Sequence, residues 1–180
     1  MNNYFKKMKG SGPSPPMTPL PNIFWSFIGA FLGIGSLHYT RFVELAAPDI
    51  NMVIGSFGAS AVLVYGAIDS PLAQPRNLVG GHIISALFGV FCYQFFGEFG
   101  IWFAGSLAVA GAIALMHLTK TLHPPGGATA LIAVIGSPQL HEIGYLYAIV
   151  PVARGALMLL IVALLVNNIP KNRQYPKSWW

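Results

Sequence analysis

The sequence predicts an all-α membrane protein with about six transmembrane helices, and three observations support this fold class. Charged residues make up 8% of the 180 residues and hydrophobic residues 54%, with a mean hydropathy of +0.61. A soluble domain usually carries about 25% charged residues, so lipid is the expected solvent. The apolar residues form long runs separated by prolines, glycines or charges, and most basic residues lie near the two ends.

The lengths of the apolar runs give the predicted helices in order. Crossing roughly 30 Å of hydrocarbon takes about 20 apolar residues at 1.5 Å each. The candidate segments are residues 23–39, 50–67, 78–96, 101–119, 125–136 and 143–167. The fifth would reach only about 18 Å, so it either begins inside the membrane or continues in a non-helical form. A four-span alternative, in which weak segments merge or drop out, stays open.

The basic residues predict the orientation and the domain boundaries. We expect a flexible cytoplasmic tail at 1–21, a transmembrane domain at 22–170 and a cytoplasmic tail at 171–180. The tails carry Lys6, Lys7, Lys9, Lys171, Arg173 and Lys177. With six crossings, Arg76 and Lys120 also fall inside and Arg41 outside, as the positive-inside rule favours. The acidic residues assigned to the outside are Glu44, Asp49, Glu98 and Glu142. Basic ends beside apolar spans indicate anchoring on anionic lipid rather than nucleic-acid binding.

Two short echoes predict an inverted three-plus-three repeat. The run HYTR at 38–41 resembles HLTK at 117–120, and GASA at 58–61 resembles GATA at 127–130. Both echoes pair a span with the third span after it, which inverts the second copy, as in many transporters with a site near the membrane midplane. Chance similarity between small, apolar runs is the alternative.

The stretch TLHPPGGATALIAVIG at 121–136 predicts a helix start that faces a small anion. Proline suits the first helical turn, glycines allow close approach to the N–H groups, and a helix start carries partial positive charge. The predicted partner is the run GSFGAS at 55–60. Together the two stretches contribute Gly55, Ser56, Gly58, Ser60, Pro125, Gly126, Gly127 and Thr129 to the candidate site. The alternative is close helix packing, the role expected for Gly29, Gly33, Gly105 and Gly111.

Three residues are candidates for tuning charge along this path: His82, His123 and Arg154. His82, expected to be partly buried, would bind an anion or relay a proton, or simply bond a carbonyl group. Arg154 lies eleven or more residues inside the sixth segment, so it should face a partner or a cavity. It suits a planar oxyanion such as nitrite or nitrate, or an ion pair with Glu98 or Glu142. Pro151 would kink that helix.

Signatures of enzymes and metal sites are absent from the sequence. It has no nucleophile elbow, phosphate-binding glycine loop or HExxH motif, and no inward carboxylate pair for acid–base chemistry. The five histidines are dispersed and Cys92 is the single cysteine, so we expect neither a metal nor another cofactor.

Four blocks of sequence resemble the HPP family of integral membrane proteins. They are IGSFGASAVLVYG at 54–66, PLAQPRNLVGGHIISALFGV at 71–90, HPPGGATALIAV at 123–134 and PVARGALMLLIVALLVNN from 151. The resemblance implies nitrite transport, the activity associated with plant and cyanobacterial members, and a family often described as having four spans. It supplies no ligand residues, and Arg154 replaces an aliphatic residue of the family pattern. Because a plastid targeting extension is not evident, a bacterial inner membrane is the expected location.

The predicted function is therefore a transporter or channel for a small inorganic anion, nitrite first, working as a homo-oligomer in the lipid bilayer. Glycine-lined helix faces support the homo-oligomer. A non-transporting membrane scaffold or sensor is the alternative, and an intramembrane enzyme is the least supported class.

Overall fold

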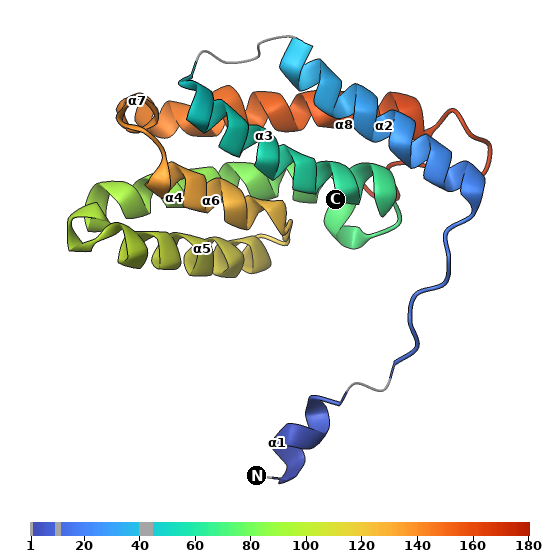
Figure 1. The fold of residues 1–180 in the computed structure, drawn as a ribbon, viewed down its shortest axis with the longest axis horizontal. Coiled ribbons are helices and arrows are strands. Elements are labelled where there is room, and N and C mark those ends of the chain that lie inside the picture. Colours follow the sequence, from blue (N-terminus) through green and yellow to red (C-terminus); the bar gives the residue numbers. More distant parts are fainter. Residues whose placement is uncertain (1, 10–11, 40–44) are drawn as a thin grey trace.

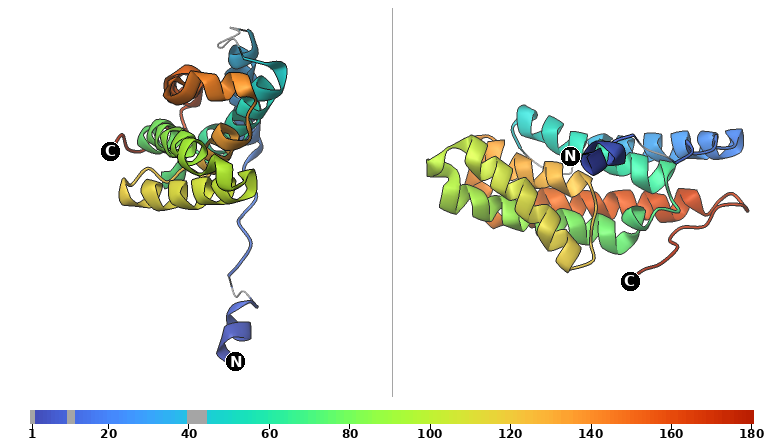
Figure 2. Two further views of the ribbon diagram at one scale, coloured as in Figure 1. Left: turned by 90° about the vertical axis from the view of Figure 1, so that its left-hand side faces the viewer. Right: turned by 90° about the horizontal axis from the view of Figure 1, so that it is seen from below.

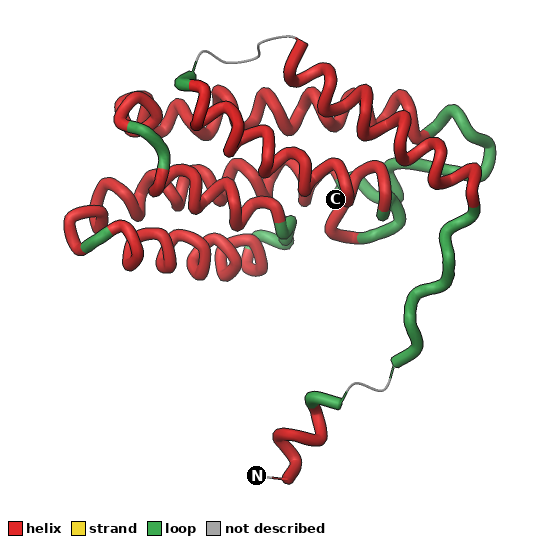
Figure 3. Tube along the Cα trace, in the orientation of Figure 1, coloured by secondary structure: helices red, strands yellow, loops and turns green. Residues whose placement is uncertain are grey.

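A computed structural model describes residues 2–9, 12–39 and 45–180, so Arg41 and Glu44 lie outside the described residues. Throughout this part of the chain, helices and loops are the structural elements and strands are absent (Figure 3). The α-helices are α1 (Asn2–Lys7), α2 (Leu20–Tyr39), α3 (Ala47–Ala61), α4 (Gly81–Phe96), α5 (Ile101–Leu118), α6 (Pro125–Ile135), α7 (Pro138–Ile143) and α8 (Arg154–Asn167).

The helices confirm a membrane protein with about six spans. Five helical stretches are long and apolar enough to cross a membrane: Leu20–Tyr39, Ala47–Gly66, Arg76–Phe99, Ile101–Leu118 and Pro138–Asn167; α6 is a shorter apolar helix. Apolar side chains also cover the surface, as on α2, where Phe24, Phe27 and Phe31 are 57%, 65% and 67% exposed. A large apolar surface of this kind is suited to lipid.

The helices of the five long spans and the shorter α6 form two layers. Helices α2, α3 and α8 pack together in one layer, and α4, α5 and α6 pack together in the other (Figures 1 and 2). Helix α3 meets α6 between the layers. Under the predicted repeat, each layer would hold two helices of one half and the third helix of the other. The repeat itself stays a prediction.

The connections lie at two opposite ends of the bundle. At the first, called the tail side here, the start of α2 contacts the C-terminal segment through Asn22 and Asn172, and Arg76 binds the Thr119 carbonyl. At the other, called the far side, Asp49 of α3 binds Ser137 before α7. An even number of crossings explains why α2 begins on the side where α8 ends.

The chain between α5 and α6 explains the short fifth span. Helix α5 ends in a Schellman turn, in which the amides of Lys120 and Thr121 donate to His117 O and Met116 O at 3.2 and 2.8 Å. Lys120 takes the positive φ of 58° that this turn requires. The following non-helical backbone is bound by protein, since Asn77 Nδ2 donates to Leu122 O at 2.9 Å. The 11 residues of α6 cover only about 16 Å, so α6 begins at partial depth.

The last span is broken, as Pro151 predicts. Val150 has the non-helical angles φ −128° and ψ 109°, and regular α-helix resumes at Arg154. Arg154 lies inside the span Pro138–Asn167, as predicted, but four residues after the break instead of within an unbroken helix. Its side chain is exposed. Neither the ligand role nor the ion-pair role of Arg154 is tested by this position.

Close packing accounts for the glycines that were assigned to helix contacts. A Cβ atom on Gly29 or Gly33 would lie 2.6 or 2.2 Å from the ring or hydroxyl of Tyr65, and one on Gly111 would lie 2.0 Å from Phe88. A Cβ on Gly105 would lie 3.0 Å from a neighbouring leucine methyl group. These predictions are confirmed, and the faces concerned are filled by this chain's own side chains.

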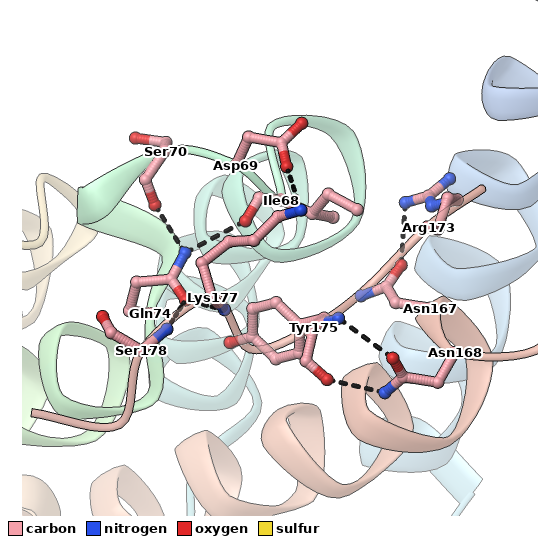
Figure 4. A network of polar contacts seen from close by, with 10 residues as sticks. All are labelled: Ile68, Asp69, Ser70, Gln74, Asn167, Asn168, Arg173, Tyr175, Lys177 and Ser178. Carbon is pink, nitrogen blue, oxygen red and sulfur yellow. Dashed lines mark hydrogen bonds and ion pairs between the residues drawn. The ribbon is translucent and has the colours of Figure 1, made fainter. Parts of the chain in front are cut away.

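The C-terminal segment packs against the tail side (Figure 4). The buried Tyr175 donates its hydroxyl to Ala73 O at 2.7 Å, and the amide of Lys177 donates to Gln74 Oε1 at 2.8 Å. Lys177 also pairs with Asp69, with 3.0 Å between the charged atoms. Residues 171–180 thus hold the loop between the second and third spans.

Arg173 in this segment is buried, at 8% exposed. Its guanidinium donates to Asn22 O, Tyr65 O and Asn167 Oδ1 at 3.0, 2.7 and 2.8 Å. Burial lowers the pKa of Arg173, and Asp69 opposes this shift. The expectation that Arg173 anchors the tail on lipid is therefore wrong, because its two terminal nitrogens donate inside the protein and its Nε is buried there without a hydrogen-bond partner among the described residues.

Candidate anion site between α3, α4 and α6

Five side chains form one buried polar cluster, called the hydroxyl–histidine network here. Its members are Ser56 and Ser60 of α3, His82 of α4, His123 before α6, and Thr129 of α6. Each is at most 4% exposed. All five belong to the residues predicted for the site, and they come from parts of the chain that the fold alone brings together.

The bonds within the network run in one line. Ser56 Oγ lies 2.9 Å from Thr129 Oγ1, which lies 2.7 Å from His82 Nδ1. His82 Nε2 lies 2.7 Å from Ser60 Oγ, and Ser60 Oγ lies 2.9 Å from His123 Nε2. The line ends on backbone carbonyl groups, because Ser56 donates to Pro125 O at 3.0 Å and His123 Nδ1 lies 2.8 Å from Leu72 O.

The two copies of the second predicted repeat echo, GASA and GATA, meet at His82. Ser60 and Thr129 are the third residues of GASA and GATA, and they contact opposite nitrogens of the His82 ring, each at 2.7 Å. Both ring nitrogens of His82 therefore contact hydroxyl groups. The bond to a carbonyl group, which was the alternative role predicted for His82, is made by His123 instead. The Phe57 ring lies against His82 with 5.0 Å between ring centroids.

The start of α6 differs from the prediction of open N–H groups. The Gly126 amide donates to His123 O at 2.8 Å and the Gly127 amide donates to Pro124 O at 3.0 Å, while Pro124 and Pro125 have no N–H. The backbone donors predicted to receive an anion are thus engaged in the first turn. The polar groups beside this helix start are instead the side chains of the network.

The four predicted glycines play different roles. A Cβ on Gly126 would lie 2.6 Å from Ser85 Oγ, so Gly126 serves close packing, whereas one on Gly127 would have its nearest neighbour, a valine methyl group, at 3.8 Å. Gly55 and Gly58 have open space where a Cβ would lie. The side-chain bonds of the network are made by serine, threonine and histidine, and Arg154 is exposed at the start of α8.

Residues that sequence reasoning missed surround the network. Tyr147 donates its hydroxyl to Thr129 O at 3.1 Å, and the Leu72 carbonyl fixes His123. Toward the far side, the fully buried Asp49 accepts from the Ser137 amide at 2.9 Å. The sequence analysis placed Asp49 only at a span end. Pro48 directly before it was a signal that could have located it more closely, because proline followed by an acidic residue is typical of the first turn of a helix.

A cavity of about 380 Å³ lies on the tail side, close to the network. Its lining residues are Pro75, Arg76, Val79, Gly80, Thr119, Thr121, Leu160, Trp179 and Trp180. Gly80 and Thr121 each lie two residues before a histidine of the network. The cavity is therefore lined by a cation and two hydroxyl groups next to the chain segments that carry His82 and His123.

Buried hydroxyl and imidazole groups inside a bundle of lipid-facing helices define a multi-pass membrane protein with a polar centre. The chain belongs to the HPP family, since the HPP transmembrane region matches residues 15–176. It is 48% identical over 182 residues to one transmembrane protein of Dictyostelium discoideum, and 43% identical over 181 residues to another. Each match covers 98% of this chain but 57% and 63% of the relatives, so the chain spans about three fifths of their length. No solved structure gives a significant match.

Proposed function

We propose that this protein transports a small inorganic anion, with nitrite as the first substrate to test. The observation that carries the proposal is the hydroxyl–histidine network, which is buried among spans that face lipid. Polar side chains inside a membrane are costly and mark solute paths by default. None of the five side chains of the network is acidic. Its three hydroxyl groups can donate to an anion, and either imidazole can take up a proton.

The proposed path joins the tail-side cavity to the network. Arg76 at the cavity would attract the anion, and Thr121 leads from there to His123. The network is closed, because Ser56 and Thr129 bond each other at 2.9 Å. Transport therefore requires α3 and α6 to separate far enough for the hydroxyl groups to turn toward the anion. Such a closed site between two packed layers suits alternating access.

The test is nitrite uptake into proteoliposomes, with nitrate, formate and chloride as competitors. Thr129→Val keeps the shape of the side chain and removes the hydroxyl that bonds His82. A hydrogen bond to a charged group contributes about 1.5–3 kcal/mol, so uptake should fall about 10-fold or more. Ser85→Ala is the matched control, because Ser85 is a buried hydroxyl of α4 that bonds Met116 Sδ instead of the network.

The outcomes separate the two classes of function. Saturable uptake that survives Ser85→Ala and is lost in a folded Thr129→Val protein supports the anion path. Absence of flux for every anion tested, in folded wild-type protein, favours the non-transporting scaffold or sensor. That alternative has its own support, because the described network atoms already bond one another, as in a purely structural polar core. We propose transport or scaffolding rather than catalysis.

The membrane and the assembly are also proposals. Both ends of the chain would lie in the cytoplasm, in line with Arg76 and Lys120 on the tail side. A bacterial plasma membrane stays a prediction, and both matched relatives come from a eukaryote. Open space at Gly55 and Gly58 of α3 supports a homo-oligomer packed on that helix, which cross-linking through Gly55→Cys would test.

A further inference from the structure

The direction of each hydrogen bond in the network can be worked out from its ends. A carbonyl oxygen only accepts, so His123 Nδ1, 2.8 Å from Leu72 O, carries a hydrogen. In a neutral ring the other nitrogen, Nε2, then accepts. Its partner at 2.9 Å is Ser60 Oγ, which must donate.

The single hydrogen of Ser60 fixes the state of His82. Ser60 cannot donate to both rings, so His82 Nε2, 2.7 Å away, carries a hydrogen and donates to Ser60. His82 Nδ1 then accepts from the Thr129 hydroxyl at 2.7 Å. The neutral network therefore has opposite tautomers on its two histidines: Nε2–H on His82 and Nδ1–H on His123.

One added proton can reside on either histidine without moving a heavy atom. On His82 it occupies Nδ1, and Thr129 turns its own hydrogen to Ser56 or to Pro125 O, which lie 2.9 and 3.4 Å away. On His123 it occupies Nε2, which donates to Ser60; Ser60 then donates to His82 Nε2, and neutral His82 carries its hydrogen on Nδ1, facing Thr129. In both protonated states Thr129 can donate to Ser56 while Ser56 donates to Pro125 O, so every bond of the line is made; in the neutral network the single hydrogen of Ser56 serves either Thr129 or Pro125 O.

We propose that His82, Ser60 and His123 form a proton relay that makes anion transport proton-coupled. In the transfer step, the His82 Nε2–H bond breaks as a new O–H bond forms on Ser60, and the former Ser60 hydrogen passes to His123 Nε2. One positive charge moves from the Thr129 end toward the Leu72 end, and no other reactant is needed. The proposal rests on the proposed function, since it names the proton as the ion that travels with the anion.

Repulsion between the two rings limits the pair to one excess proton at a time. The ring centroids of His82 and His123 are 5.0 Å apart, so two charged rings would repel each other. The titratable or charged groups on the elements packed around them include Asp49, Arg76, Cys92, Tyr93, His117, Tyr145, Tyr147 and Arg154. Asp49 is bonded to Ser137, Arg76 to Thr119 O, and Tyr147 to Thr129 O. His117 and Arg154 are exposed and Cys92 is buried.

The first test reads the tautomers and does not depend on transport. In protein labelled with ¹⁵N-histidine in nanodiscs, the nitrogen chemical shifts report which ring atom carries hydrogen, and His82→Gln and His123→Gln assign the signals. We expect Nε2–H on His82 and Nδ1–H on His123, and acidification should shift both rings together as one proton is shared. The same tautomer on both rings, or independent titration in the wild type, would overturn the relay.

The second test measures protons per nitrite with a pH dye inside proteoliposomes, at alkaline pH where nitrous acid is negligible. We expect a proton to accompany each nitrite in the wild type and in Ser85→Ala. The ratio should fall in Ser60→Ala and recover in Ser60→Thr, which restores the hydroxyl. An unchanged ratio in folded Ser60→Ala would overturn the relay. If nitrite does not move at all, the proposed function fails, and the tautomers still decide on the relay.

Discussion

Alanine at the two adjacent glycines of the HPPGG motif should have different effects on stability. A Cβ on Gly126 would lie 2.6 Å from Ser85 Oγ, 3.0 Å from Met116 Sδ and 3.1 Å from Gly81 O. The serine can rotate, but the carbonyl oxygen belongs to the backbone of α4 and cannot move away on its own. A Cβ on Gly127 would meet its nearest neighbour, Val109 Cγ1, at 3.8 Å, which is ordinary contact.

The size of the difference follows from the two environments. Overpacking at Gly126 should cost about 1–3 kcal/mol, whereas alanine at Gly127 should gain up to about 1 kcal/mol because a helical glycine loses more chain entropy than alanine on folding. For a chain of this length, each kcal/mol shifts Tm by about 2–4 °C. Because both glycines are helical and the entropy gain applies to both, Gly126→Ala should melt at least about 2 °C below Gly127→Ala, which should melt at or above wild type.

The assay is thermal unfolding in one detergent, followed by circular dichroism. The double variant Ser85→Ala/Gly126→Ala removes the nearest clash and should regain part of the lost stability, an interaction that the double-mutant cycle measures. If the two alanine variants are equally stable, α4 does not approach α6 as closely as the geometry states.

Three further predictions concern the two ends of the bundle. Asp49→Ala should lower the free energy of unfolding by about 1–3 kcal/mol, because the Ser137 amide loses its acceptor; chemical denaturation of this variant beside Asp49→Asn measures it. Tyr175→Phe should cost about 1 kcal/mol through the lost bond to Ala73 O, and faster tryptic cleavage at Lys177 would report the loosened segment. Burial raises the pKa of Tyr175, so the absorbance titration of wild type minus Tyr175→Phe should have its midpoint above about 10. Because the pKa of Tyr175 is higher in the folded than in the unfolded protein, the stability that its neutral phenol contributes is present below about pH 10 and is lost as the pH rises further. A titration midpoint at or below about 10 would contradict the burial of Tyr175.

The sequence determined that lipid surrounds the helices, and it predicted about six spans with their approximate bounds. These depend on run length, hydropathy and helix-breaking residues, which are local properties. It also indicated the break near Pro151, the short fifth span and the five polar side chains of the network. Ser56 and Thr129 could be proposed as partners because the echoes between the two halves pair their helices.

Only the tertiary structure decided how those side chains bond. The contacts of the network join residues separated by 22 to 73 positions in the sequence, and their distances depend on how closely α4 and α6 approach at Gly126. The same holds for Arg173, a tail residue by sequence that the fold buries, and for Arg154, which the helix break moves to the start of α8. Charge and hydropathy are properties of the local sequence, so they can be read from it directly. Hydrogen-bond partners and burial depend on how distant helices pack in the two layers, so only the tertiary structure gives them.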